Sequence, residues 1–262
     1  MTTAQHSAPP KDARHRAQRW FQSHQRRSIS NGYDRVQAAG SQQLSGAVLL
    51  ANHRRMYGRE AKTMLDIGCG DGSTLATVAK ARPSITLVGT DPVAEAVSSA
   101  RCNVPSAQVE QLSGALAGSF DAILIHLCLG LWDDIESQLS YAVSQLSPTG
   151  VLYIADLNAA DAAAALETAT TPAERRYLRE QYAAAYTASG LRDLLRRCAP
   201  KGTSEVGTSP LGGYLPGSAA HLALISDPMV TAVLRTMNRD QDQHPIPRWV
   251  PNLVHGWVWS GN

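Results

Sequence analysis

The sequence predicts an α/β fold in which a mostly parallel β-sheet carries helices on both faces, and three observations lead to it. Short apolar runs at 64–67 and 85–91 have the composition of buried parallel strands. Glycines occupy alternate positions between 68 and 72, directly after the first run, as in a tight turn. An amphipathic helical pattern over 73–80 joins the two runs, so residues 64–91 form a βαβ unit.

The glycine turn and Asp91 together indicate a nucleoside-binding site. Closely spaced glycines permit positive φ angles and let a ligand lie against bare backbone. Asp91 ends the second strand about 20 residues after the turn, where a carboxylate can accept both hydroxyls of a ribose. The spacing is G-x-G-x-G rather than the G-x-G-x-x-G of dinucleotide-binding proteins, so a pyrophosphate cofactor is not favoured.

The stretch DIGCGDG at 66–72 resembles motif I of the class I S-adenosylmethionine-dependent methyltransferases. In that family the loop wraps the methionine part of the cofactor, and the acid after the second strand holds the ribose. The resemblance implies a Rossmann-like, seven-stranded, mostly parallel sheet with an antiparallel last strand and an N-terminal helical cap. It also implies S-adenosyl-L-methionine as cofactor and S-adenosyl-L-homocysteine as product.

Two further stretches extend the resemblance to residues 30–157. Residues 118–127 resemble motif IV, a strand that is introduced by Ser-Phe-Asp and ends near the cofactor methyl group. Residues 146–156 approach the family's Leu-x-Pro-Gly-Gly turn and fifth strand, with Thr149 in place of a glycine. After its third strand, here 107–112, the family carries an acid for the adenine amino group. This chain has no acid there, so we expect backbone and Ser113 to hold the adenine.

The motifs and the resemblance give a set of expected site residues. The cofactor-binding residues would be Tyr33, Asp66, Gly68, Cys69, Gly70, Gly72, Asp91, Pro92, Leu112, Ser113 and His126. His126 ends the fourth strand at the sheet's carboxyl edge, where ligands bind, and the ordinary pKa of histidine lies near neutral pH. It is therefore a candidate base or substrate contact, the alternative being a buried, hydrogen-bonded histidine. His255 is a second candidate base, and Trp132 and Trp257 are expected to contact the substrate.

The chain divides into three predicted parts. Residues 1–30 would be a disordered or basic helical arm, and 31–226 the methyltransferase domain with a helical insertion at about 158–187. Within the domain we expect a helix at 36–51, a helix break near 189–190, and two antiparallel edge strands at 203–209 and 219–226. Residues 227–262 would be an aromatic extension that either packs on the sheet or forms a lid; its tryptophans are Trp249, Trp257 and Trp259.

Composition argues against several other classes of protein. The 262 residues are 44% apolar and 18% charged, as in globular domains, and the net charge of +2 does not indicate nucleic acid. The four cysteines form no C-x-x-C pair, which favours neither a disulfide scaffold nor a zinc site. No apolar run approaches the length of a membrane span. We therefore expect a cytoplasmic protein without metal, membrane or nucleic acid, either a monomer or a homodimer.

The glycine loop indicates the cofactor well and the acceptor poorly. Methyl transfer chiefly requires alignment of donor and acceptor, and a base is needed only when the acceptor must lose a proton. The favoured function is methyl transfer to an O, N or C atom of a small molecule, in bacterial specialised metabolism. Two alternatives stay open: an acceptor on a carrier-bound acyl group or RNA, docked by the basic segment 11–27, and a cofactor-binding protein of this fold that transfers no methyl group.

Overall fold

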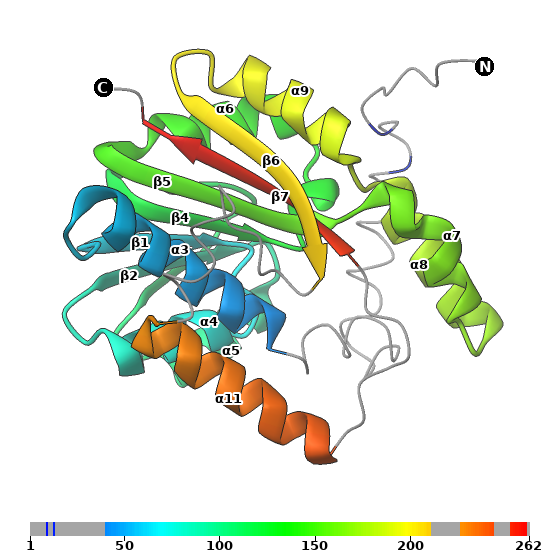
Figure 1. The fold of residues 1–262 in the computed structure, drawn as a ribbon, viewed down its shortest axis with the longest axis horizontal. Helices are drawn as coiled ribbons and strands as arrows, with labels where there is room; N and C mark the ends of the chain where they lie inside the picture. Colours follow the sequence, from blue (N-terminus) through cyan, green and yellow to red (C-terminus); the bar gives the residue numbers. More distant parts are fainter. Residues whose placement is uncertain (1–8, 10–12, 14–39, 211–225, 244–251, 261–262) are drawn as a thin grey trace.

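The computed structural model describes residues 9, 13, 40–210, 226–243 and 252–260. They build a seven-stranded sheet in the order β3-β2-β1-β4-β5-β7-β6 (Figure 1). Neighbouring strands are parallel except β7, which is antiparallel to both β5 and β6. The strands are β1 Thr63–Ile67, β2 Thr86–Asp91, β3 Gln108–Gln111, β4 Phe120–His126, β5 Leu146–Leu157, β6 Thr203–Pro210 and β7 Asn252–Trp259. The predicted Rossmann-like, mostly parallel fold is confirmed.

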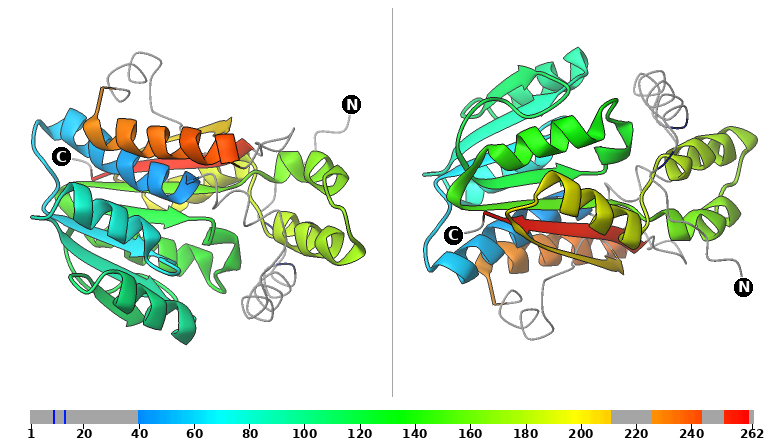
Figure 2. Two further views of the ribbon diagram at one scale, coloured as in Figure 1. Left: turned by 90° about the horizontal axis from the view of Figure 1, so that it is seen from below. Right: turned by 90° about the horizontal axis from the view of Figure 1, so that it is seen from above.

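Helices cover both faces of the sheet, as predicted. One core cluster joins the sheet to α3, α4, α5 and α11, and a second joins the opposite face to α6 and α9. Figure 2 shows α3 and α11 side by side on one face and α9 on the other. The helices are α3 Ser41–Tyr57, α4 Ser73–Ala81, α5 Ala94–Asn103, α6 Ile135–Ser144, α7 Ala162–Glu167, α8 Pro172–Ala183, α9 Ala188–Cys198 and α11 Pro228–Gln243, with 3-10 turns η1 Leu129–Leu131 and η2 Ala159–Asp161.

The last two strands differ from the prediction, which placed both at the sheet edge. The seventh strand is Asn252–Trp259, and it lies inside the sheet between β5 and β6. Residues 219–225 lie outside the described part of the chain, and Ser226 is in a turn. Leu253 and Trp257 enter one core cluster while Val254 and Val258 enter the other, so β7 is buried on both faces. A domain boundary at 226 and a lid made by 252–259 are therefore wrong.

The helical insertion lies where the sequence predicted it, with one difference at its end. In Figure 1, α7 and α8 project beyond the carboxyl end of β5. The predicted break near 189–190 is instead at 184–187, because the Thr187 side chain accepts a hydrogen bond from the Gly190 amide and caps α9. The insertion thus joins β5 to α9 at the edge where ligands bind in open α/β sheets.

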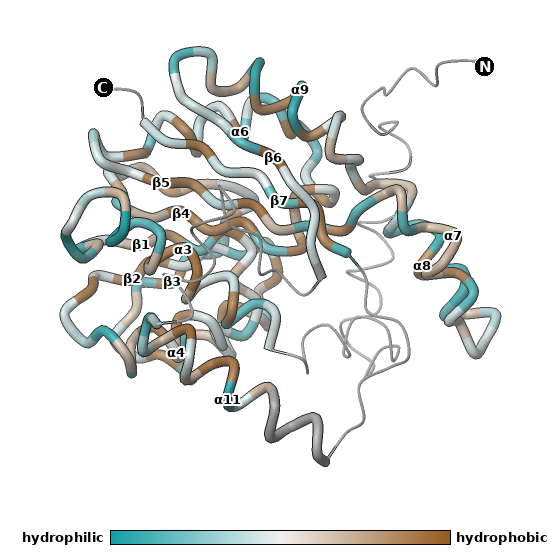
Figure 3. Tube along the Cα trace, in the orientation of Figure 1, coloured by the Kyte–Doolittle hydropathy of each residue, from teal (hydrophilic) through white to brown (hydrophobic). Residues whose placement is uncertain are grey.

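The helix predicted at 36–51 corresponds to α3, and its burial is unusual for its composition. Polar Ser41, Ser45, Asn52 and His53 are all fully buried, because α3 is packed between the sheet and α11. Figure 3 shows hydrophobic residues gathered along the central strands beneath it. No helix in the described ranges combines the length and apolarity needed to cross a membrane.

Candidate active site

The glycine turn after β1 is held in the left-handed conformation that its sequence predicts. Gly68, Gly70 and Gly72 have φ angles of 78°, 56° and 79°. The amides of Gly68 and Cys69 both donate to the Thr90 carbonyl, at 2.7 and 3.0 Å, which fixes the turn to the end of β2. A Cβ at Gly68 would lie 2.7 Å from the Cys128 sulfur, whereas one at Gly70 would have no atom of the described residues within 4 Å. The turn is therefore packed behind Gly68 and open at Gly70.

Asp91 connects this turn to the end of β2. Its carboxylate accepts hydrogen bonds from the Gly70 amide at 3.0 Å and the Val93 amide at 2.9 Å. Burial raises the pKa of Asp91. The structure also brings the residues after β3 to the same edge, since the Leu112 amide donates to the Asp91 carbonyl at 3.1 Å. Pro92, Leu112 and Ser113 are exposed there, so a ligand can reach them.

Asp66 is a buried carboxylate with no hydrogen-bond partner in the described part of the protein. Its side chain is fully buried, and neither oxygen is satisfied. Burial, together with the nearby Asp91 charge, raises the pKa of Asp66 to about 7. An unpaired buried carboxylate is costly, so this position fits a positively charged group of a ligand. Asp66, Asp91 and the open face at Gly70 thus suit a cationic nucleoside such as S-adenosylmethionine.

Cys69, also predicted to bind the cofactor, turns its side chain away from this edge. A Cβ at Gly89 would lie 2.9 Å from the Cys69 sulfur, and Cys69 belongs to the core cluster on the α3 face. Burial raises the pKa of its thiol. Only the backbone of Cys69 is therefore available to a ligand.

His126 lies at the carboxyl end of β4, between two hydroxyls of α3. Its Nδ1 is 3.1 Å from Ser45 Oγ, and its Nε2 is 3.3 Å from Ser41 Oγ. Burial, with a smaller effect of the His255 charge, lowers the pKa of His126 to about 3. The next residue, Leu127, has a φ of 53°, which is uncommon for a residue other than glycine. Residues with such backbone conformations cluster at functional sites. His126 is thus a neutral histidine held in place by α3.

His255 lies in the core rather than at an open edge. Its Nδ1 is 2.8 Å from the Tyr153 hydroxyl, and its Nε2 is 3.1 Å from Ser209 Oγ. Burial lowers the pKa of His255 to about 4. Trp257 is also fully buried and stacks on Tyr153, with ring centroids 4.0 Å apart. The expectation that Trp257 contacts the substrate is therefore corrected: β7 holds it in the core.

Asp156, at the end of β5, shapes the loop after β4. Its carboxylate accepts from the Leu129 amide at 2.8 Å and from the Leu157 amide at 2.7 Å. Burial raises the pKa of Asp156 to about 6. Trp132 follows η1 and is 7% exposed, packed in the core cluster on the face opposite α3. Both residues fix the loop in place.

Two residues named in the sequence analysis, Tyr33 and Trp249, lie outside the described part of the chain. The sequence analysis did not predict the partners of the two histidines, because no local motif marks a polar residue within a helix or strand. These partners are Ser41, Ser45, Tyr153 and Ser209. A tyrosine among apolar strand residues is the only sequence signal, since a buried hydroxyl usually requires a partner. Within the described residues, no group of three or more histidine, cysteine or acidic side chains could hold a metal.

Comparison with families and curated proteins points to the segment from β1 to β5. A family model described as "Methyltransferase domain" matches residues 65–152. The trans-aconitate 2-methyltransferase of Azoarcus sp. (strain BH72) is 32% identical over 98 residues, which are 36% of this chain and 39% of that enzyme. The chain thus matches only about two fifths of the length of this relative.

Comparison with solved structures extends the likeness to nearly the whole chain. The plantazolicin methyltransferase BpumL, in complex with a pentazolic desmethylPZN analog and SAH, has a TM-score of 0.82 and 29% identity, covering 96% of this chain and 97% of that chain. The plantazolicin methyltransferase BamL, in complex with a triazolic desmethylPZN analog and SAH, has a TM-score of 0.83 and 27% identity, with coverage of 96% and 97%. The likeness therefore reaches well beyond the segment that carries the glycine turn.

Proposed function

Since this chain is a class I S-adenosylmethionine-dependent methyltransferase, we propose that it methylates a free amine of a peptide-derived, azole-bearing natural product. The observation that carries the choice of an azole-bearing acceptor molecule is the match to BpumL and BamL over 96% of the chain, both in complex with azolic desmethylPZN analogs. A family likeness confined to the cofactor-binding half would leave the acceptor open.

The cofactor would be held by residues gathered at the carboxyl edge. The turn at 68–72 would receive the methionine part, and Asp91 would accept the ribose hydroxyls. Asp66 would pair with the cofactor's positive charge, because its buried carboxylate has no hydrogen-bond partner within the described part of the chain. Leu112 and Ser113 would flank the adenine. When bound, S-adenosylmethionine supplies a methyl group whose C–S bond breaks, with the electron pair left on sulfur, as the acceptor's lone pair forms the new bond.

The candidate bases among the described side chains favour an acceptor that needs no protein base. Burial gives His126 and His255 pKa values of about 3 and 4, so neither takes up a proton readily at neutral pH. Both oxygens of Asp156 already accept backbone amides. A free amine attacks through its own lone pair, and the product ammonium then loses a proton to water. An alcohol or acidic carbon would require a base that His126, His255 and Asp156 do not supply.

The proposal is tested with synthetic azole-bearing peptides that differ only at the terminal amine. We expect the free-amine peptide to gain methyl groups in the presence of S-adenosylmethionine, as measured by mass spectrometry, and the N-acetylated peptide to stay unmodified. Trans-aconitate is tested as an alternative methyl acceptor that offers a carboxylate, because the relative that is 32% identical over 98 residues is named for it. Methylation of the acetylated peptide or of trans-aconitate alone would contradict the proposal.

A further inference from the structure

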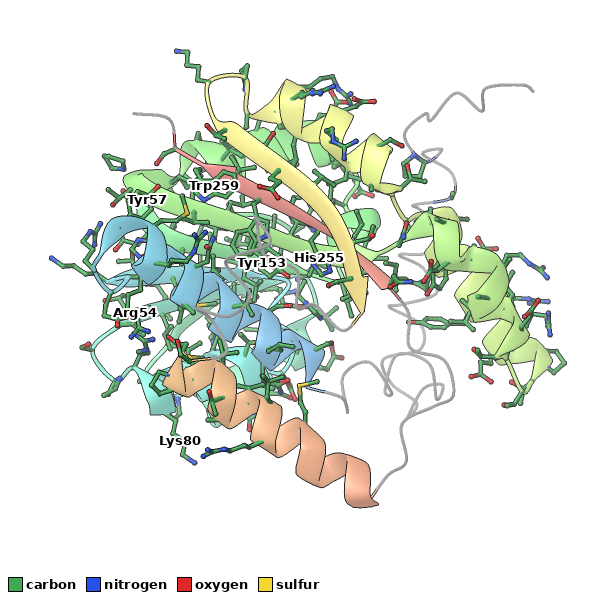
Figure 4. The ribbon with its side chains drawn as sticks, in the orientation of Figure 1. Arg54, Tyr57, Lys80, Tyr153, His255 and Trp259 are labelled. Atoms are coloured by element: carbon green, nitrogen blue, oxygen red, sulfur yellow. The ribbon has the colours of Figure 1, made fainter. Side chains whose placement is uncertain are left out.

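A buried hydrogen-bonded chain of side chains crosses the sheet beneath α3. It runs from His126 through Ser45 to Tyr153, then to His255 and Ser209, so that it joins β4, α3, β5, β7 and β6. Figure 4 shows Tyr153 and His255 close together in the middle of the sheet. Ser45, Tyr153 and His255 are fully buried, and His126 is 4% exposed. We call these five residues the relay.

The direction of each hydrogen bond in the relay follows from its last member. The Ser209 carbonyl lies 3.4 Å from His255 Nε2, and a carbonyl can only accept. The Ser209 hydroxyl, at 3.1 Å, can donate or accept, so the carbonyl decides the direction. His255 Nε2 therefore carries the proton. Because a neutral imidazole has one donor and one acceptor nitrogen, Nδ1 of His255 is an acceptor.

The remaining bonds then have one consistent arrangement. The Tyr153 hydroxyl donates to His255 Nδ1, at 2.8 Å, so its oxygen accepts from the Ser45 hydroxyl. With its proton directed at Tyr153, the Ser45 oxygen accepts from His126 Nδ1, at 3.1 Å. His126 Nε2 is left with its lone pair, which faces the Ser41 hydroxyl at 3.3 Å. Reversing the relay would direct the His255 Nε2 lone pair at the Ser209 carbonyl, and two acceptors would then face each other.

We infer that Tyr153 and His255 are positioning residues that hold His126 in the Nδ1–H tautomer and leave Nε2 as a hydrogen-bond acceptor at the carboxyl edge. The consequence for activity rests on the proposed function. An amine must keep its lone pair for the methyl group and direct its N–H groups at acceptors. A donor at Nε2 would compete for that lone pair, whereas the acceptor tautomer, directly or through the Ser41 oxygen, receives an amine N–H.

The tautomer is measured in the ligand-free protein by two-bond ¹H–¹⁵N correlation spectra of ¹⁵N-histidine-labelled full chain, with His126→Gln used for assignment. We expect His126 in the wild type to be protonated at Nδ1 only. In Tyr153→Phe the Ser45 proton loses its fixed direction, so signals of both tautomers should be present. The matched control is Tyr186→Phe, which removes a buried tyrosine hydroxyl on the opposite face of the sheet and should leave the His126 signals unchanged.

Kinetics then separate positioning from simple structural support. In Tyr153→Phe we expect cofactor affinity and acceptor KM to stay within about two-fold. We expect kcat to fall roughly ten-fold, which is the effect of losing one hydrogen bond in the transition state. Ser45→Ala breaks the relay at a second point and replaces Tyr153→Phe if that variant does not fold. An Nε2–H tautomer in the wild type, or an unchanged tautomer in both variants, overturns the inference. The spectra need no substrate, so absence of turnover on every amine would contradict the proposed function alone.

Discussion

At the scale of single residues, the most informative group is the Asp66 carboxylate, which has no hydrogen-bond partner among the described residues. A buried carboxylate without hydrogen bonds destabilises the empty protein, and its raised pKa of about 7 expresses that cost. The position is unfavourable for folding and favourable for binding a cation. Residues of this kind mark sites where stability is lower than the sequence could achieve.

Asp66→Asn should therefore stabilise the empty protein and weaken cofactor binding. The folded-state pKa of Asp66 is raised, so its contribution to stability is lost as pH rises from its ordinary value of 3.8 through about 7. We expect the free energy of unfolding at alkaline pH to increase by about 2 kcal/mol in the variant, with little change below about pH 4. Urea unfolding at the two pH values measures this, and equal effects at both would be inconsistent with it.

Cofactor affinity should rise with pH for the same reason. Only the ionised Asp66 attracts the positive charge of the cofactor, so the wild type should bind S-adenosylmethionine more tightly at about pH 8 than at about pH 6. Asp66→Asn should bind equally at both values. Calorimetric titration of the two proteins makes the comparison, and an equal pH dependence in wild type and variant would assign the titration to another group.

Asp91→Ala tests the ribose contact separately. The variant removes a carboxylate that also accepts the Gly70 and Val93 amides. We expect affinity for S-adenosylhomocysteine to fall roughly ten-fold or more, because a hydrogen bond to a charged group is lost. Calorimetry measures it, with Asp71→Ala as control, since Asp71 is exposed and its carboxylate accepts from the Ser73 amide, close by in the sequence. Similar losses in both variants would point to general damage of the glycine turn.

At the scale of elements, Asp227 fixes α11 to the helices beside it. One oxygen accepts from the Met229 amide at 2.9 Å and caps the helix, and the other accepts from Arg54 of α3 at 2.8 Å. Arg82, just after α4, approaches the same oxygen at 3.4 Å. Since Asp227 is only 1% exposed, these interactions are poorly screened by water.

Asp227→Ala should lower the free energy of unfolding by about 2 kcal/mol, the sum of a lost cap and a lost charged hydrogen bond. Denaturant unfolding is the measurement. Asp193→Ala serves as the control, because its pair with Arg196 is exposed and should contribute less than about 0.5 kcal/mol. A loss in Asp227→Ala no larger than that of the control would show that α11 is held by apolar packing alone.

At the scale of the whole molecule, residues 252–259 complete the sheet. β7 pairs with β5 on one side and β6 on the other, so that β6 reaches the sheet only through β7. A chain ending at 226 should therefore fail to fold cooperatively, as followed by circular dichroism during thermal unfolding. If the tail were a lid instead, the shortened chain would unfold like the full chain and would still bind S-adenosylhomocysteine.

From the sequence, the βαβ unit and the glycine turn could be predicted, and the resemblance of residues 66–72 to motif I indicated the cofactor class. These features are local, because residues 64–91 contain all the signals for them. The signals are the glycines that permit positive φ, the strand and helix periodicity, and the position of Asp91. The helical insertion after β5 was predicted for the same reason, since alanine-rich and proline signals mark it locally.

The place of β7 in the sheet and the surroundings of the two histidines became known from the three-dimensional structure. The tail sequence is compatible with an edge, a lid or an interior strand, and pairing with β5 and β6 selects the last. His126 meets Ser45 across 81 positions of the chain, and Tyr153 meets His255 across 102. A histidine's pKa and tautomer depend on such distant partners and on burial, which no local pattern encodes. For that reason the position of His126 at the end of the fourth strand could be predicted from the sequence, but its burial and its hydrogen-bond partners could not.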